Sequence, residues 1–305
     1  MIRMILSSLV LVSSQSVLNK QALRMTSTHQ CFVDIGANLL DERFTQGSYH
    51  GKVRHEPDFD QVLQRAANVG MRHMILTAGT LAESRDAVRR VRELRLSNQT
   101  DCQLYCTVGV HPTRSMEFED ASNADENLEE LLALVKDGMT DGVVASVGEI
   151  GLDYDRLEFC PKDIQRKHFV RQLQLSEKSG LPLFLHNRNV GEDLYNILVQ
   201  HKNTWKSGVV HSFDDSLELA KKFIDLGLYI GLNGCSLKTK ENLEVVKTLP
   251  LEKIVLETDC PFCDVKRTHA GFEFVKTHFD CKPDKKFQRG MQVKVSITSL
   301  ASDMF

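Results

Sequence analysis

Residues 147–155 read VGEIGLDYD and carry three carboxylates within seven residues, directly after the apolar residues 143–146. The apolar run predicts a strand that is buried on both faces, as strands of parallel sheets are. A carboxylate at such a place loses its hydration, which is costly unless a partner compensates for it. The sequence therefore predicts that a cation or a hydrogen-bonding group holds Glu149.

Short stretches rich in Val, Ile and Leu recur along the chain and alternate with segments of helical periodicity, for example around Phe59 and Leu128. Gly70 and Gly180 stand where helices would end before strands, and they predict left-handed residues there. Eight such units in about 230 residues favour an α/β fold of the (β/α)₈ barrel type over an open sheet. The predicted strands are residues 32–38, 73–79, 104–111, 143–153, 181–187, 208–213, 228–234 and 254–260.

Four polar residues follow apolar runs at equivalent places in four of these units: Glu149, His186, His211 and Asp259. In a barrel of this kind the C-terminal ends of the strands meet at one opening. Mixed oxygen and nitrogen ligands suit Zn²⁺, Mn²⁺ or Mg²⁺. Each residue alone can be a structural group, such as a hydrogen-bonded His or a helix-capping Asp. The shared placement of all four favours a metal site.

The composition is that of a globular protein, with 42% hydrophobic and 26% charged residues. The net charge of −3 argues against a protein that binds duplex nucleic acid through its overall positive charge, although bound metals would add positive charge. The eight cysteines are scattered, which favours a reduced intracellular setting over a secreted disulfide scaffold. One cluster can be read either as a loose zinc knuckle or as loop residues: Cys260, Cys263, His269, His278 and Cys281.

Residues 1–30 form an N-terminal extension with Arg3, Lys20 and Arg24, many serines and no Asp or Glu. Its apolar run, residues 5–12, is much shorter than the roughly 20 residues that span a bilayer. The extension is either a targeting segment, for example for the mitochondrion, or an upstream start ahead of Met25. No other segment is a membrane candidate, and no obligate protein partner is evident.

Several motifs together resemble the TatD family of metal-dependent deoxyribonucleases, most closely its eukaryotic branch. The resemblance covers about residues 31–288, so we place the hydrolase domain at residues 31–290. It implies a TIM-like barrel of the amidohydrolase type that hydrolyses DNA, from the 3′ end, in the nucleus or cytoplasm. The motifs are residues 32–39 (FVDIGANL), 108–114 (VGVHPTR), 148–155 (GEIGLDYD), 184–186 (FLH), 211–213 (HSF), 233–236 (NGCS) and 257–261 (ETDCP).

The resemblance also implies roles for individual residues. Glu149, His186, His211 and Asp259 would bind one or two divalent ions. Glu149 would touch both ions, and Asp259 would orient the attacking water as a general base. Three further side chains would hold the phosphates of the DNA substrate at the same rim: His111, Arg114 and Arg188.

The start of the first strand departs from a common family pattern. Many members carry a His-x-His pair there, whereas this chain has Gly36 and Asn38. Asp34 or Asn38 could replace the lost nitrogen ligands only with oxygen, which favours Mg²⁺ or Mn²⁺ over Zn²⁺. On the fourth strand we expect Asp153 and Asp155 to shape the following loop through turn bonds rather than to bind metal.

The C-terminal tail, residues 291–305, alternates like a short strand and lacks the family's closing helix. Without that helix an apolar seam between the last strand and the first would stay uncovered. Losing on the order of 10 kcal/mol of gross apolar burial is comparable with the net stability of a domain. We therefore expect a chain that melts earlier than one with a family-type closing helix.

Two other functions fit the same residues. The site could activate water against a carbonyl, in an amide or ester hydrolase or an enzyme that removes aminoacyl groups from tRNA, because a fold does not select the substrate. The chain could also be a truncated, non-catalytic isoform. A panel of phosphodiester and acyl substrates separates the first from a nuclease, and metal binding without any hydrolysis would indicate the second.

Overall fold

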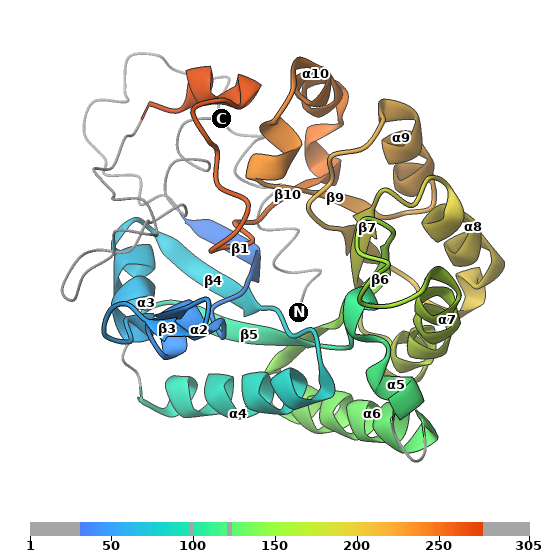
Figure 1. The fold of residues 1–305 in the computed structure, drawn as a ribbon, viewed down its shortest axis with the longest axis horizontal. Coiled ribbons are helices and arrows are strands. Elements are labelled where there is room, and N and C mark those ends of the chain that lie inside the picture. Colours follow the sequence, from blue (N-terminus) through green and yellow to red (C-terminus); the bar gives the residue numbers. More distant parts are fainter. Residues whose placement is uncertain (1–30, 98–99, 121–123, 277–305) are drawn as a thin grey trace, which may run out of the picture. The chain divides into compact units, whose positions relative to one another are not determined.

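Eight parallel strands follow one another in chain order around a single sheet in the computed structural model, which describes residues 31–97, 100–120 and 124–276 (Figure 1). Each of the eight predicted strands overlaps an observed one, and the predicted (β/α)₈ barrel is confirmed. The strands are β1 (Phe32–Ala37), β4 (Met71–Leu76), β5 (Gln103–Val108), β6 (Val144–Asp153), β7 (Leu183–Arg188), β8 (Gly208–Val210), β9 (Tyr229–Leu232) and β10 (Ile254–Leu256).

The barrel is joined between β1 and the residues that follow β10. The backbone N–H of Asp259 donates to the carbonyl of Gly36 at 2.8 Å, and that of Asn38 donates to the carbonyl of Cys260 at 2.9 Å. The carboxylate of Asp34 adds side-chain bonds to Thr258 across the same seam. These bonds bring the first and last strand ends to one opening.

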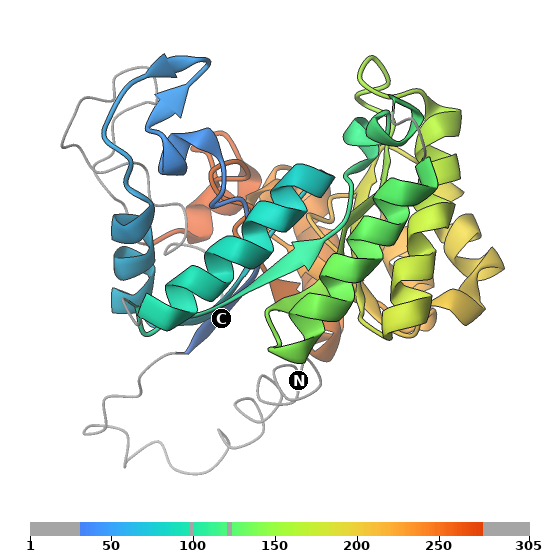
Figure 2. The same ribbon diagram turned by 90° about the horizontal axis from the view of Figure 1, so that it is seen from below.

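Helices cover the outside of the sheet, and α4, α6 and α7 lie side by side along it (Figures 1 and 2). The apolar stripe predicted around Phe59 forms the buried face of α3. Gly180, which caps α7, has a φ of 74°, and Gly70 after α3 has a φ of 98°, so both expected left-handed glycines are confirmed. The helices are α2 (Glu42–Thr45), α3 (Phe59–Asn68), α4 (Leu81–Ser97), α5 (Glu117–Asp120), α6 (Ala124–Thr140), α7 (Lys162–Ser179), α8 (Asp193–Gln200), α9 (Leu217–Asp225) and α10 (Lys240–Thr248).

A small antiparallel hairpin between α2 and α3 was not predicted. It pairs β2 (Ser48–Tyr49) with β3 (Lys52–Val53) through a two-residue turn at His50 and Gly51, both with positive φ. Strands of two residues are too short to show an alternating pattern in the sequence. Mirror-image turns of this kind suit hairpins because their twist matches that of the strands.

Several expectations fall outside the described residues: the N-terminal extension (1–30), the C-terminal tail (291–305), and His278 and Cys281. Among the helices that the structure does describe, none combines the length and the apolar character needed to cross a membrane.

Candidate metal and catalytic centre

Glu149 lies at the middle of a small cluster of buried side chains. It stands on β6, where all ten residues are buried, as the sequence predicted for this strand. Its Oε1 atom is 2.6 Å from Nδ1 of His186, on β7, and 2.7 Å from Nε2 of His211, which follows β8. The structure thus brings together three of the four predicted ligands, with donor atoms within 4.8 Å of one another.

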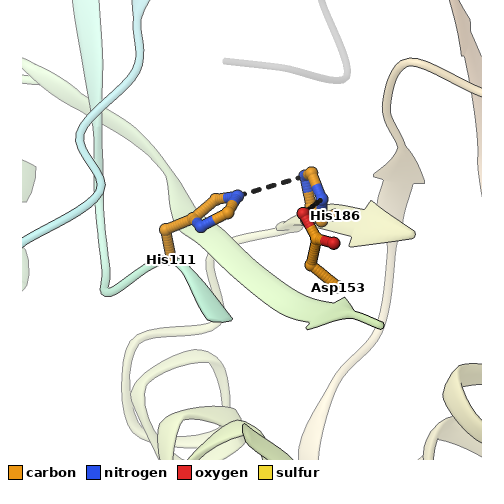
Figure 3. Close-up of side chains that lie close together, drawn as sticks. All are labelled: His111, Asp153 and His186. Carbon is orange, nitrogen blue, oxygen red and sulfur yellow. Dashed lines mark hydrogen bonds and ion pairs between the residues drawn. The ribbon is translucent and has the colours of Figure 1, made fainter. Parts of the chain in front are cut away.

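A second carboxylate, that of Asp153, contacts the other ring nitrogen of His186. The Nε2 atom of this ring is 3.1 Å from Oδ2 of Asp153, whose side chain is fully buried (Figure 3). The other oxygen of Asp153 accepts from the backbone N–H of Asp155, which is the turn bond expected from the sequence. The contact with His186 was not predicted, because the sequence does not show which distant side chain the second oxygen of Asp153 faces.

A carboxylate also lies near the other ring nitrogen of His211. Its Nδ1 atom is 3.4 Å from Oε1 of the buried Glu257, which directly follows β10. The same oxygen accepts from the backbone N–H of Ser212 and from Nδ2 of Asn233 at 3.2 Å. Sequence reasoning missed Glu257, although it lies two residues before Asp259 in the predicted strand 254–260.

These two pairs fix which nitrogen of each ring faces Glu149. A carboxylate accepts the proton of His186 Nε2 and attracts that of His211 Nδ1, so the opposite nitrogens present lone pairs to the interior. These nitrogens, 3.3 Å apart, converge with the carboxylate oxygen of Glu149. Three electron-pair donors that point at one place repel one another unless a proton or a cation lies between them. The donor set therefore fits a divalent ion.

The electrostatics of the cluster agree with this reading. Burial alone would raise the pKa of Glu149, but positive charge on His211 holds it well below its ordinary value. Burial would lower the pKa of His211, but the charges of Glu149 and Glu257 raise it well above its ordinary value. The centre thus keeps a negative oxygen and attracts positive charge.

His111, expected at the rim as a phosphate-binding group, lies against the cluster (Figure 3). Its Nε2 atom is 3.3 Å from Nδ1 of His186 and 3.5 Å from Oε1 of Glu149. Burial, together with the charge of His186, lowers the pKa of His111 to about 3, so the ring is neutral near pH 7. Its Nδ1 accepts from the backbone N–H of Thr113 at 3.2 Å, which leaves the ring proton on Nε2.

Asp259 lines the same cavity but is not part of the three-residue group. One of its carboxylate oxygens accepts from Nδ2 of Asn38 at 2.7 Å, and the other accepts from the thiol of Cys263 at 3.0 Å. Burial raises its pKa, an effect that His211 offsets and Glu149 and Glu257 reinforce. Its φ of 49° is uncommon for a residue with a side chain, and such strain gathers at functional sites.

Asp34, offered by the sequence as a further ligand, points to the seam between the first and last strands. Its Oδ1 accepts from the backbone N–H groups of Gly36 (3.1 Å) and Thr258 (3.0 Å), and its Oδ2 accepts from the Thr258 hydroxyl at 2.6 Å. Asp34 does not line the cavity. Its placement indicates a structural role.

The two positions of the missing His-x-His pair are occupied in other ways. A Cβ atom added at Gly36 would lie 2.8 Å from Cζ of Phe184 and 3.0 Å from Oε2 of Glu257, so a larger side chain there would require Phe184 to move. Asn38 accepts from the Thr77 hydroxyl at 2.6 Å and donates to Asp259. In this chain, therefore, the first strand orients a carboxylate that follows the last strand.

The cluster opens into a cavity of about 340 Å³. Arg114 and Arg188 line it, as expected of phosphate-binding groups, and Arg156, which the sequence reading did not select, joins them. Its full lining comprises Asn38, Leu40, Asp41, Thr77, Ala78, Gly79, Glu83, His111, Thr113, Arg114, Glu149, Arg156, His186, Arg188, His211, Asp259, Phe262 and Cys263.

Within the described part of the chain, Cys260, Cys263 and His269 do not form a group of converging metal ligands. Cys260 is buried, and Cys263 contacts Cys235 instead. The described residues thus give no support to the zinc-knuckle reading and favour the reading as loop residues.

Comparison with known proteins identifies the family. The family described as "TatD related DNase" matches residues 33–291. The protein named deoxyribonuclease Tat-D of Schizosaccharomyces pombe is 42% identical over 280 residues, which cover 88% of this chain and 87% of that protein. The chain belongs to the TatD related DNase family. It is therefore a hydrolase that acts on ester bonds, and the resemblance inferred from the motifs is confirmed.

Two further relatives extend the comparison. A Shigella flexneri protein named 3′-5′ ssDNA/RNA exonuclease TatD is 30% identical over 232 residues, covering 75% of this chain and 78% of that protein. The crystal structure of a TatD family hydrolase from Entamoeba histolytica superposes with a TM-score of 0.78 at 39% identity. It covers 87% of this chain and 86% of that one.

Proposed function

We propose that this member of the TatD related DNase family is a divalent-metal-dependent deoxyribonuclease that removes nucleotides from the 3′ end of DNA. The observation that carries the proposal is the convergence of Glu149, His186 and His211, each histidine backed by its own carboxylate. Such an arrangement is typical of a metal centre, because the outer carboxylate fixes the tautomer and orientation of the ligand. The names of relatives from yeast and bacteria support DNA as the substrate and the 3′ end as the point of attack.

Glu149, His186 and His211 would hold the metal, with Asp259 across the cavity as the fourth ligand. When bound, one or two divalent ions would polarise the phosphate and lower the pKa of a water molecule. Mg²⁺ or Mn²⁺ is the proposed ion because the first strand contributes no nitrogen ligand, and Zn²⁺ is the alternative. Asp34 is not among the proposed ligands because its carboxylate oxygens already accept hydrogen bonds from Thr258 and Gly36.

The remaining groups would bind the phosphodiester and move the proton. Asp259, whose pKa is raised mainly by burial, would accept a proton from the attacking water. The neutral ring of His111 would donate its Nε2 proton to a phosphate oxygen as a hydrogen bond. Arg114 and Arg188, both on the cavity wall, would pair with the phosphate charge.

The mouth of the cavity favours a single-stranded end. Phe262 lines the cavity and is 52% exposed, and the guanidinium of Arg43 lies 4.4 Å from the centre of its ring. Exposed aromatic rings bind single strands because every base can stack on them. A cavity of about 340 Å³ is of the size that takes one small molecule, so it would receive a terminal nucleotide rather than a duplex.

The test uses the full chain with three substrates: a 3′-labelled single-stranded oligonucleotide, the same strand labelled at its 5′ end, and an aminoacyl ester. We expect Mn²⁺-dependent release of the 3′ label as mononucleotide, and its loss in EDTA. Early release of the 5′ label would overturn the proposed direction. Hydrolysis of the ester alone would overturn the nuclease proposal and favour the acyl hydrolase.

We propose that residues 31–290 form the hydrolase domain, that residues 1–30 are a separate extension, and that the enzyme acts in the nucleus or cytoplasm. Fluorescent tagging of the chain with and without residues 1–30 would test the address, since a mitochondrial signal would disappear with the extension.

A further inference from the structure

A pair of thiols adjoins the candidate centre and has no part in the function proposed above. The Sγ atoms of Cys235 and Cys263 are 2.9 Å apart, and neither cysteine is in a disulfide. Cys235 lies in the short helix η3 (Gly234–Leu237), and Cys263 lies in the loop that follows β10. The two residues are 28 positions apart in the chain, so only the fold brings them together.

The backbone in this region is placed for a bond between the two sulfurs. A Cβ atom added at Gly234 would lie 2.1 Å from the carbonyl oxygen of Cys263, which means that only a glycine lets the two segments approach so closely. The side chain of Asn233 accepts from the backbone N–H of Cys235 at 2.8 Å and fixes the start of η3. Because a disulfide has an S–S distance of about 2.05 Å, the sulfur atoms need to approach by only about 1 Å.

The thiol pair is also connected to the chemistry. The Cys263 thiol donates to Oδ2 of Asp259 at 3.0 Å, and Cys263 lines the cavity. Asp259 is otherwise held by Asn38 on its other oxygen. Any change at the Cys263 sulfur therefore acts directly on the carboxylate that faces the metal site.

We propose that Cys235 and Cys263 are a site of oxidative modification: a peroxide converts them into a disulfide, which lowers hydrolysis by removing the thiol that holds Asp259. Formation of the bond does not depend on the proposed function. The loss of activity rests on the role proposed for Asp259.

The chemistry balances with one peroxide molecule. The Cys235 thiolate attacks one peroxide oxygen, forming an S–O bond and breaking the O–O bond, and the hydroxide that leaves takes up the Cys235 proton to become water. The Cys263 sulfur then attacks the sulfenic sulfur, forming the S–S bond and breaking the S–O bond, and the second hydroxide leaves as water with the Cys263 proton. Two thiols are oxidised by two electrons, and the peroxide is reduced to two water molecules.

Cys235 is suited to the first step. The ammonium of Lys238, next to Cys235, favours the thiolate form of Cys235, whereas burial raises the pKa of Cys102 and Cys106 to about 12. Thiolates, not thiols, attack peroxides. Among these cysteines, oxidation should therefore begin at Cys235.

The bond itself is tested by mass spectrometry on the full, metal-free chain. After treatment with hydrogen peroxide and alkylation of the remaining thiols, trypsin should release residues 223–238 joined to residues 254–266, lighter by two hydrogen atoms than the two reduced peptides. Fragment ions should place the bond at Cys263 and not at Cys260. Absence of the joined peptide, or a bond to Cys260, would overturn the proposal.

The effect on activity is tested on the same samples after removal of peroxide and addition of Mn²⁺, with bis(4-nitrophenyl) phosphate as substrate. We expect the oxidised chain to lose about tenfold or more of its rate and to regain it with dithiothreitol, because small displacements of catalytic groups are costly. Cys235→Ser should keep the untreated rate and become insensitive to peroxide. Cys31→Ser, which removes an exposed thiol elsewhere, should respond like the unaltered chain.

The possible failures are distinguishable. A joined peptide with an unchanged rate would overturn the inhibitory effect while leaving the bond. Equal inhibition of Cys235→Ser and the unaltered chain would assign the loss to another oxidation and overturn the role of the pair. No hydrolysis in any sample would remove the proposed function and with it the inhibitory effect, whereas the peptide would still decide the bond.

Discussion

Glu149 and Asp34 are both buried carboxylates in or beside strands of the same barrel, yet their surroundings differ in kind. Asp34 accepts from neutral donors, two backbone N–H groups and the Thr258 hydroxyl, and burial raises its pKa to about 7. Glu149 faces histidines, which hold its pKa well below the ordinary value in spite of burial. The first carboxylate can exist as a neutral acid and joins the ends of the sheet. The second needs positive charge, which is the property of a metal site.

The largest expected free-energy effect concerns Asp34 and pH. The pKa of Asp34 rises from its ordinary 3.8 to about 7 in the folded chain, so the folded form binds the proton more tightly than the unfolded form. The resulting stabilisation is complete below about pH 4 and is lost as pH rises through about 7. It amounts to on the order of 4 kcal/mol. Asp34→Asn, which keeps an acceptor for the backbone and has no charge, should not show this loss.

Urea unfolding of both proteins between pH 4 and pH 8 measures this difference. The unfolding free energy of the unaltered chain should fall relative to that of Asp34→Asn as the pH rises. Parallel curves would mean that Asp34 has no raised pKa and that its bonds hold a permanently charged group.

Glu149→Gln should abolish most activity while leaving the fold. Replacing an outer partner of a metal ligand costs 10- to 100-fold, so loss of the ligand itself should cost more than about 100-fold in rate. The matched control is Asp34→Asn, the same change of carboxylate to amide at a buried strand position, which should keep hydrolysis within a few fold. The rate of bis(4-nitrophenyl) phosphate hydrolysis and the bound Mn²⁺, measured by mass spectrometry, are compared between the two variants. Equal losses in the two variants would contradict the distinct roles.

Asp153→Asn should weaken metal binding by about 10- to 100-fold, because His186 loses the carboxylate that orients its Nε2 atom. High Mn²⁺ should restore the rate, since the ligands themselves remain. Asp155→Asn is the control: Asp155 bonds to Asn189 on the loop beyond, and its loss should change Mn²⁺ affinity little. Calorimetric titration with Mn²⁺ measures the metal affinity of both variants. If both variants bind Mn²⁺ as the unaltered chain does, Asp153 is only a turn residue.

The smallest expected effect is at the cavity mouth. Phe262→Ala should raise KM for a single-stranded oligonucleotide about tenfold, since stacking of one base contributes about 1 to 3 kcal/mol. It should leave bis(4-nitrophenyl) phosphate unaffected. An oligonucleotide that lacks the terminal base should no longer distinguish Phe262→Ala from the unaltered chain. Phe159→Ala, an exposed aromatic residue outside the cavity, serves as control.

The fold was predictable because its signals are local. The strands are short runs rich in apolar residues, of which β6 is buried along its whole length, and the helices show their own period, so the eight units could be counted along the chain. The strand boundaries differ by a few residues, for example at β8, which ends at Val210 instead of Phe213. The β2–β3 hairpin was not predicted because strands of two residues show no alternation of apolar and polar residues.

The candidate site was predictable only in part. Glu149, His186 and His211 follow apolar runs, and the structure brings them into contact. Glu257 was not predicted as a partner of His211. It directly follows the apolar run of β10, beside Asp259, and no local pattern shows that its oxygen faces His211. The oxygen that Asp153 turns to His186 escaped for the same reason. Contacts between residues tens of positions apart are set by barrel closure, which leaves no mark in a local pattern.

The sequence by itself determined the eight-unit barrel, the family and the polar residues at the strand ends, because these depend on local periodicity and on motifs. The tertiary structure alone decided which carboxylate faces which histidine, that Asp34 joins the sheet, and that Cys235 meets Cys263. The physical reason is that a side chain's charge and pKa depend on the neighbours that the fold brings within a few ångströms, and these neighbours come from distant parts of the chain.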